Sequence, residues 1–320
     1  MIIRNEQIES LLSSRQEQAR IQGEKKRDDI YKRYPSLKEL DKNIQVSRSD
    51  ILLQVVSSPG KKPDYKNLYS LETRRRLFLQ GEGISEDFSE PVSFCALCRD
   101  TGTIGEELCS CYKELLIPVL IQEGGLSDYK EMTFSQYSDE YYSDSDNMSL
   151  VRKLCDEYVL GFPWQRKSNL FLGKPGTGKT FLALCIANEV VRKGIPVFFV
   201  RMNELLDIMN MYRIQMMSFS PDAELLLQLM KKREMIFGAD LLVIDELGVE
   251  AKGPNTTADL LEVLGNRRIK KLSTLITSNL TAADLQKSYD NRLYSRLFGD
   301  FSLVPFSGQD IRLHPTYKKR

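Results

Sequence analysis

The stretch Leu170-Phe-Leu-Gly173-Lys-Pro-Gly-Thr-Gly178-Lys179-Thr180 decides the fold, because an apolar segment runs directly into a glycine-rich loop. Glycines let the backbone curl so that successive N–H groups point inward at phosphate oxygens. A helix that begins after such a loop adds the positive end of its dipole. The spacing Gly-x4-Gly-Lys-Thr, between a strand and a helix, therefore predicts a phosphate-binding loop.

The residue types of this loop assign roles for binding ATP. Lys179 supplies a mobile positive charge to the β- and γ-phosphates, and Thr180 offers a hydroxyl to Mg²⁺. The predicted ATP-binding residues are Gly173, Lys174, Pro175, Gly176, Thr177, Gly178, Lys179, Thr180 and Phe181.

Two acids follow a second apolar segment, Leu241–Ile244. The carboxyl end of a parallel strand is where ligands bind in an α/β sheet. Asp245 can therefore hold Mg²⁺, and Glu246 can orient and deprotonate an attacking water. Solvated strand-end charges are the alternative, and the complete phosphate loop upstream argues against it. The pair predicts an ATPase.

Two further elements complete the predicted site. Asn279 follows the apolar segment Thr274–Thr277, where it can touch the γ-phosphate or the lytic water; it can instead cap the helix that starts at Thr281. Arg292 and Arg296 are spaced i, i+4 on one predicted helical face. Such arginines are usually solvated, but in a head-to-tail assembly one of them can reach a neighbour's γ-phosphate.

Four of the six cysteines form the pattern Cys95-x2-Cys98 and Cys109-x-Cys111. Clustered cysteines in a chain without a secretion signal indicate metal ligands, and four thiolates suit a closed, structural zinc site. Glycines between the two pairs permit a hairpin that brings them together. An iron–sulfur cluster is the alternative metal centre, but its usual ligand spacings match poorly. Cys155 and Cys185 are predicted to be buried packing residues.

The chain from about residue 148 alternates apolar strands with amphipathic helices, which predicts an α/β fold with a parallel sheet. The predicted strands are Asn169–Leu172, Val197–Val200, Leu241–Ile244, Thr274–Thr277 and Leu303–Phe306. The predicted helices lie near 179–193, 203–217, 222–235, 256–271 and 281–298.

The predicted domains are a helical docking region at 1–93, a zinc module and its following helix at 94–127, a linker at 128–147 and the ATPase domain at 148–320. In the first region Pro35 separates two helices and a third covers 68–80; a solvated helical tail is the competing interpretation. The fourth helix is expected at 112–122.

The 320 residues carry a net charge of +1. Contact with nucleic acid would therefore depend on a local patch, for which the basic residues of 201–213 and 231–233 are candidates. We find no secretion signal and no apolar run near the roughly 18 residues that span a membrane. A cytoplasmic protein without a membrane partner is expected.

Together these elements resemble the DnaC-type helicase loaders, in the AAA+ branch that also contains the IstB transposition helpers. The similarity is closest to clostridial-type DnaC proteins, whose Ser-Arg-Leu and Asp-Ile-Arg motifs read Ser295-Arg296-Leu297 and Asp310-Ile311-Arg312 here. It is specific from about residue 94 onward and loose before that. The family often has two aspartates where this chain has Asp245-Glu246, and this departure favours competent hydrolysis.

The resemblance implies an AAA+ core without a helical lid, and a zinc-binding, helical amino-terminal region that binds the hexameric replicative helicase. It implies self-association into an ATP-dependent spiral or ring around single-stranded DNA. It also suggests Arg296 as the arginine acting in trans, with Arg292 as alternative or partner. Two other functions stay open: an IstB-like transposition helper, against which the cysteine module argues, and a non-hydrolysing zinc-dependent adaptor that uses ATP as a switch.

Overall fold

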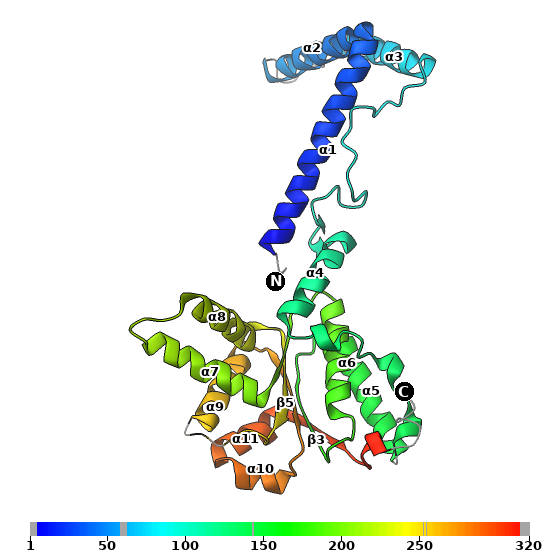
Figure 1. Cartoon of the computed structure of the whole chain (residues 1–320). Helices are drawn as coiled ribbons and strands as arrows, with labels where there is room; N and C mark the ends of the chain where they lie inside the picture. The colour runs from blue at the N-terminus through cyan, green and yellow to red at the C-terminus, as the bar shows by residue number, and fades with distance from the viewer. Residues whose placement is uncertain (1–4, 58–62, 143, 252, 254, 314–320) are drawn as a thin grey trace. The chain divides into compact units, whose positions relative to one another are not determined.

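The computed structural model describes residues 5–57, 63–142, 144–251, 253 and 255–313. The chain divides into two compact units, Met1–Tyr112 and Lys113–Arg320 (Figure 1). Residues 1–4 and 314–320 of the predicted terminal domains lie outside the described residues, and the predicted domain boundaries remain predictions. Within the described part, no helix combines the length and apolarity needed to cross a bilayer.

Three helices dominate the first unit: α1 (Glu6–Arg33), α2 (Pro35–Ser57) and α3 (Lys66–Gly81). The Asn5 side chain caps α1 by accepting the N–H groups of Gln7 and Ile8. Pro35 starts α2, a position where its missing N–H is not needed. The small core between these helices is formed by Leu37, Leu79 and Phe88. The three predicted helices are confirmed.

A hairpin follows, formed by β1 (Thr103–Ile104) and β2 (Glu107–Leu108), which pair antiparallel. Gly102 and Gly105 adopt positive φ at its two ends, as the predicted hairpin requires. The predicted fourth helix is α4 (Ser110–Glu123).

The second unit contains a five-stranded parallel sheet in the order β4-β5-β6-β3-β7. Its strands, all of them predicted, are β3 (Ser168–Gly173), β4 (Val197–Arg201), β5 (Leu241–Leu247), β6 (Ser273–Ser278) and β7 (Phe301–Phe306). Its helices are α5 (Ser145–Gly161), α6 (Lys179–Arg192), α7 (Met202–Met217), α8 (Ala223–Gly238), α9 (Thr256–Ile269), α10 (Ala282–Ser288) and α11 (Asn291–Asp300).

Helices cover both faces of this sheet, with α5 and α6 on one face and α7, α8 and α9 on the other (Figure 1). Alternate strand residues such as Phe198, Leu242 and Ile276 enter the core on the α7–α9 side. Because both faces are buried, β4, β5 and β6 are almost continuous buried runs, whereas the edge strand β7 is buried only at Phe301, Val304 and Phe306.

Two helix predictions need correction. The single helix predicted at 281–298 is divided into α10 and α11, because Tyr289 is extended and Asp290 caps a new helix by accepting the Leu293 N–H. The helix α5 was not predicted, since it begins inside a polar, acidic segment. The predicted linker forms short 3₁₀ turns at Ser127–Tyr129, Phe134–Gln136 and Asp139–Tyr141.

After β7 the structure has only a 3₁₀ turn, Ile311–Leu313. The absence of a helical lid stays a prediction, because the described residues end at Leu313.

Candidate active site

The phosphate loop lies between the end of β3 and the start of α6. Gly176 and Gly178 have φ of 75° and 90°, a left-handed conformation that favours glycine. The Lys179 ammonium donates hydrogen bonds to the carbonyls of Gly173 and Lys174, both at 2.7 Å. The loop therefore has the predicted form, and the Lys179 side chain lies over the loop and bonds to its backbone carbonyls.

Burial lowers the pKa of Lys179 to about 8, an effect that the nearby Asp245 carboxylate partly offsets. An ammonium that is desolvated in this way lacks a full counter-charge. A bound phosphate would supply that charge and favour the protonated form.

Asp245 at the end of β5 is almost fully buried and lies beside the loop. Its Oδ1 accepts hydrogen bonds from the hydroxyls of Thr180, at 2.8 Å, and Thr277, at 2.6 Å. The two predicted magnesium ligands, Thr180 and Asp245, are thus brought together from positions 65 residues apart. Hydroxyl and carboxylate oxygens are ligands that Mg²⁺ accepts, so this pair fits the ion.

Glu246, the residue after the buried acid, differs from it in backbone conformation and in exposure. The register between β5 and β6 shifts between Ile244 and Leu247, and Glu246 takes a φ of 63°. The side chain is exposed, and its backbone N–H donates to the Thr277 hydroxyl at 3.0 Å. A left-handed glutamate is strained backbone of the kind concentrated at functional sites.

Thr277 therefore positions both acidic residues, because its hydroxyl donates to the Asp245 carboxylate and accepts from the Glu246 backbone N–H. Sequence reasoning assigned no role to this residue. A threonine near the carboxyl end of an apolar strand suggests a role at the site. To assign that role, however, one must know that β6 lies next to β5 in the sheet.

Thr277→Val is expected to reduce ATP turnover by about tenfold or more, because a hydrogen bond to a charged group is lost and Glu246 loses its backbone anchor. Steady-state hydrolysis and nucleotide affinity are to be measured together. Thr277→Ser, which keeps the hydroxyl that makes both hydrogen bonds, is the matched control. Unchanged turnover in Thr277→Val would contradict the positioning role.

Asn279 does not cap α10, so that alternative is wrong: the cap is Thr281, whose hydroxyl accepts the Asp284 N–H while Asp284 reaches back to the Thr281 N–H. Asn279 instead lines a cavity of about 370 Å³ with Gly173 and Lys174 of the phosphate loop. Its contact with the γ-phosphate or water stays a prediction.

The two arginines of α11 lie apart from the loop within this chain. The Arg292 side chain is 86% exposed, and the Arg296 guanidinium lies against Gly265 of α9. Neither makes a hydrogen bond or ion pair with the phosphate loop among the residues that the structure describes.

The segment after β7 packs on the phosphate loop. The Ile311 N–H donates to the Gly176 carbonyl at 2.9 Å, and the Asp310 carboxylate fills the space beside that glycine. Arg312 pairs with Asp310, and its charge also lowers the pKa of Lys179. The Asp310-Ile311-Arg312 motif, for which the sequence indicated no role, therefore lies against the phosphate loop.

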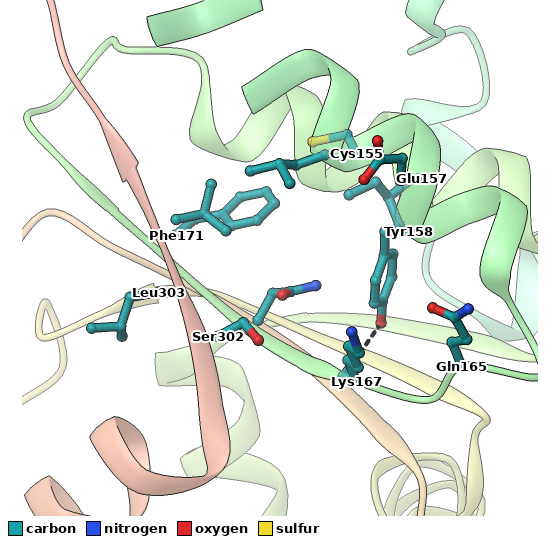
Figure 2. A pocket seen from close by; sticks show the side chains of 12 residues that line it. Cys155, Glu157, Tyr158, Gln165, Lys167, Phe171, Ser302 and Leu303 are labelled. Atoms are coloured by element: carbon teal, nitrogen blue, oxygen red, sulfur yellow. Dashed lines mark hydrogen bonds between the residues drawn. The ribbon is translucent and has the colours of Figure 1, made fainter. Parts of the chain in front are cut away.

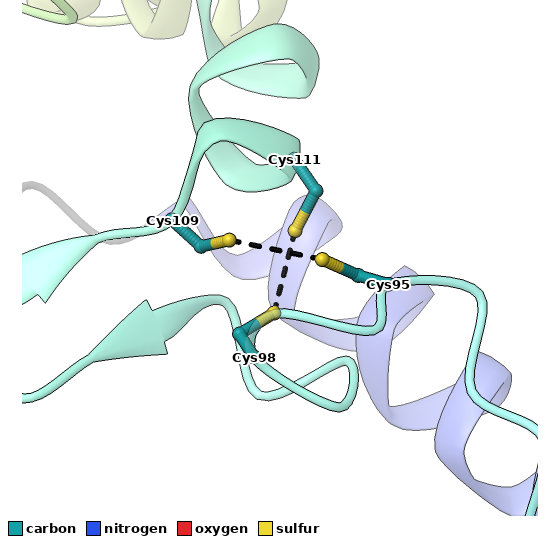
Figure 3. Close-up of side chains that lie close together, drawn as sticks. All are labelled: Cys95, Cys98, Cys109 and Cys111. Atoms are coloured by element: carbon teal, nitrogen blue, oxygen red, sulfur yellow. Dashed lines mark hydrogen bonds between the residues drawn. The ribbon is translucent and has the colours of Figure 1, made fainter.

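The four clustered cysteines converge, with their Sγ atoms all within 4.8 Å of one another (Figure 3). Cys95 Sγ lies 3.7 Å from Cys109 Sγ, and Cys98 Sγ lies 3.4 Å from Cys111 Sγ. A tetrahedral zinc site with Zn–S bonds of 2.3 Å has sulfur–sulfur edges of about 3.8 Å. The predicted ligand set is assembled, and its geometry fits zinc.

The pKa values of these thiols also fit a cation. Backbone N–H groups, that of Cys98 first, lower the pKa of Cys95 to about 7, whereas burial and neighbouring thiols raise the pKa of Cys111. Four thiols this close cannot all ionise unless a cation balances their charge.

Asp100 supports the cluster and was missed from the sequence. It is fully buried, and its two oxygens accept the N–H groups of Phe94 and Cys95, both at 2.8 Å. Such carboxylates behind a ligand fix the ligand's orientation.

A separate cavity of about 270 Å³ lies between α5 and strands β3 and β7 (Figure 2). The Tyr158 hydroxyl donates to the Lys167 carbonyl on its wall. Cys155 lines it and is buried, which raises its thiol pKa to about 12. Both Cys155 and Cys185 are buried, as predicted.

Basic side chains on α7 and α8 are mostly paired with acids. Arg213 makes a bidentate pair with Asp259, and Lys232 pairs with Glu204. Arg233 pairs with Glu262. The DNA contact predicted there stays a prediction, with fewer free charges to support it.

The parallel sheet, its glycine loop and the acids that meet there define a P-loop nucleotide-binding protein. A model of the family described as IstB-like ATP binding protein matches residues 130–314, and this chain belongs to that family.

Relatives in the family include the replicative helicase loader DnaC of Escherichia coli K12, 27% identical over 60% of this chain and 73% of the relative. The insertion sequence IS5376 putative ATP-binding protein of Geobacillus stearothermophilus is 31% identical over 40% of this chain and 46% of the relative. A crystal structure of DnaI matches with a TM-score of 0.45 and 20% identity, covering 58% of this chain and 93% of that chain.

Proposed function

We propose that this chain is an ATPase that binds the hexameric replicative helicase and helps place it on single-stranded DNA. One observation supports hydrolysis most: Asp245 accepts the hydroxyls of Thr180 and Thr277 while the same Thr277 hydroxyl anchors Glu246. This arrangement separates a buried acid suited to a metal from an exposed acid suited to a water.

Each residue then has a task. The loop N–H groups and Lys179 bind the phosphates, and Thr180 and Asp245 hold Mg²⁺, which neutralises phosphate charge when bound. Glu246 orients the attacking water and accepts its proton, with Asn279 beside the γ-phosphate.

We further propose that the helicase is bound by the amino-terminal region, 1–93, and that the 94–127 module holds one structural zinc. The helicase as partner is supported by the relatives, because the replicative helicase loader DnaC matches 60% of this chain and the insertion-sequence protein 40%. The ATPase domain, from 148 onward after the 128–147 linker, would assemble head to tail around the DNA. The setting would be the cytoplasm.

Arg296→Ala is expected to leave ATP binding unchanged and to reduce turnover of the assembled protein by about a thousandfold, because an arginine from a neighbour stabilises the charge that develops in phosphoryl transfer. Turnover is measured with helicase and single-stranded DNA present. Arg292→Ala is the matched variant on the same helix. Normal turnover in both variants would exclude α11 as the source of a trans-acting arginine.

The test of the function is co-purification of the full chain with the host's replicative helicase, with and without ATP, followed by ATPase assay on single-stranded DNA. A stable complex and DNA-stimulated hydrolysis are expected. Binding to a transposase but not to the helicase would favour the IstB-like alternative, which the insertion-sequence relative supports. Complex formation without any turnover would favour the adaptor.

A further inference from the structure

A buried acid and a buried tyrosine meet behind the loop that follows Glu246. Glu250 and Tyr289 are 8% and 7% exposed, and the tyrosine hydroxyl donates to Glu250 Oε1. The other oxygen, Oε2, accepts the Gly248 N–H at 2.7 Å. The Glu250 carboxylate is thus fixed between two elements that are 39 residues apart in the chain.

One end of this contact belongs to the hydrolysis loop, which we define as residues 245–250. Gly248 has a φ of 99°, and a β-carbon there would collide with Leu280. The Ser278 hydroxyl also donates to the Leu247 carbonyl, at 2.6 Å. The path of this loop is therefore fixed closely, two residues after the strained Glu246.

The other end belongs to the start of α11. Tyr289 precedes Asp290, the residue that caps this helix. Leu293 and Leu297 are fully buried and anchor one face of α11, whereas Arg292 is exposed on it. A shift of Tyr289 would consequently move the first turn of the helix that carries both arginines.

The contact is suited to a stable donor–acceptor pair. Burial and the bond to Glu250 raise the pKa of Tyr289, so the phenol keeps its proton. A buried carboxylate without its hydrogen bonds is strongly disfavoured, so the loop and the tyrosine are expected to move together.

We propose that Glu250 and Tyr289 couple the hydrolysis loop of one chain to the arginine helix that this chain presents to its neighbour. They are positioning residues, because their side chains bond to Gly248 and to each other and have no hydrogen bond to the phosphate loop among the described residues. A change at Glu246 on nucleotide binding passes through Gly248 and Glu250 to Tyr289, and so to Arg292 and Arg296. This inference rests on the proposed function, because the arginines serve a second copy only in an assembly.

Amide hydrogen exchange of the full chain, with and without Mg²⁺ and a non-hydrolysed ATP analogue, tests the coupling without requiring assembly. In the unmodified protein, exchange is expected to slow both in the phosphate loop, 173–180, and in α11. In Tyr289→Phe the phosphate loop is expected to respond as before, while the response of α11 falls by about fivefold or more.

Two variants sharpen the comparison. Tyr294→Phe is the matched control, because this tyrosine lies on α11 and its hydroxyl makes no hydrogen bond among the described residues; an unmodified response is expected. Glu250→Gln can keep both contacts, with its oxygen toward Gly248 and its amide toward Tyr289, so it should retain the α11 response. Glu250→Ala, which removes both bonds, replaces Tyr289→Phe if melting shows the latter unfolded.

The proposal is overturned if α11 responds equally in Tyr289→Phe, or if it fails to respond in the unmodified protein while the phosphate loop does. A phosphate loop that does not respond in the unmodified protein would instead refute the nucleotide site, and with it the proposed function and the coupling. Failure of the coupling is thus seen in the exchange of α11, and failure of the proposed function in the exchange of the phosphate loop.

Discussion

We expect Lys179→Ala to lower the affinity for ATP by at least a hundredfold. The ammonium is desolvated and donates hydrogen bonds to two backbone carbonyls and, at 3.5 Å, to the Thr177 hydroxyl, so it gains a charged partner when a phosphate replaces these neutral acceptors. Affinity is measured with a fluorescent ATP analogue by direct titration. Lys153→Ala is the control, because it also removes one lysine charge from the same unit but from an exposed position on α5.

The charge of Lys179 is also expected to make ATP affinity depend on pH, which distinguishes the effect of its charge from that of its size. Its pKa without nucleotide is about 8, so the charged form is present below that value and lost above it. Affinity is therefore expected to fall as pH rises beyond about 8, and Lys179→Ala should show no such fall. Equal affinity in Lys179→Ala and the unmodified chain would refute the phosphate-loop assignment.

Replacing Cys95 and Cys98 together by serine is expected to remove the metal and unfold the hairpin of β1 and β2. Structural zinc contributes roughly 10 kcal/mol or more of folding free energy in small sites, and this hairpin has only two residues in each strand. Metal content by elemental analysis should fall from about one zinc per chain to none.

Cys155→Ser with Cys185→Ser is the matched control, since both thiols are buried outside the cluster; zinc should be retained. The ATP affinity of the Cys95/Cys98 variant should stay near that of the unmodified chain, since the phosphate loop and its acids belong to the second unit. If the Cys95/Cys98 variant kept its full zinc content, Cys95 and Cys98 would not be ligands.

The sequence predicted the strands and the phosphate loop because both depend on local pattern: buried parallel strands are apolar runs, and the loop has a fixed spacing. It also predicted the cysteine ligands, whose grouping is local. The sequence did not reveal the role of Thr277. Its hydroxyl bonds to Asp245 on the neighbouring strand β5, and the order of strands in a sheet is not a local property of the sequence. It missed Asp100 for a similar reason, since a buried carboxylate that accepts two backbone N–H groups leaves no spacing pattern.

The predicted helix boundaries were wrong where a capping residue determines the start of the helix. Asp290 caps α11 and divides a segment whose apolar periodicity continues through it. Thr281 took the capping role that had been one option for Asn279, because Asp284 completes a capping box with it. In each case a short polar side chain that accepts a backbone N–H determines where the helix begins.

The positive φ of Glu246 has a consequence for which acids this position accepts. Aspartate and asparagine tolerate the left-handed conformation better than longer side chains do, because their short polar groups can bond to the local backbone. An aspartate would relieve backbone strain here but would withdraw its carboxylate by one methylene group. At this position an aspartate would therefore lower the backbone strain and shorten the reach of the carboxylate, whereas the glutamate of this chain keeps the longer reach at the cost of that strain.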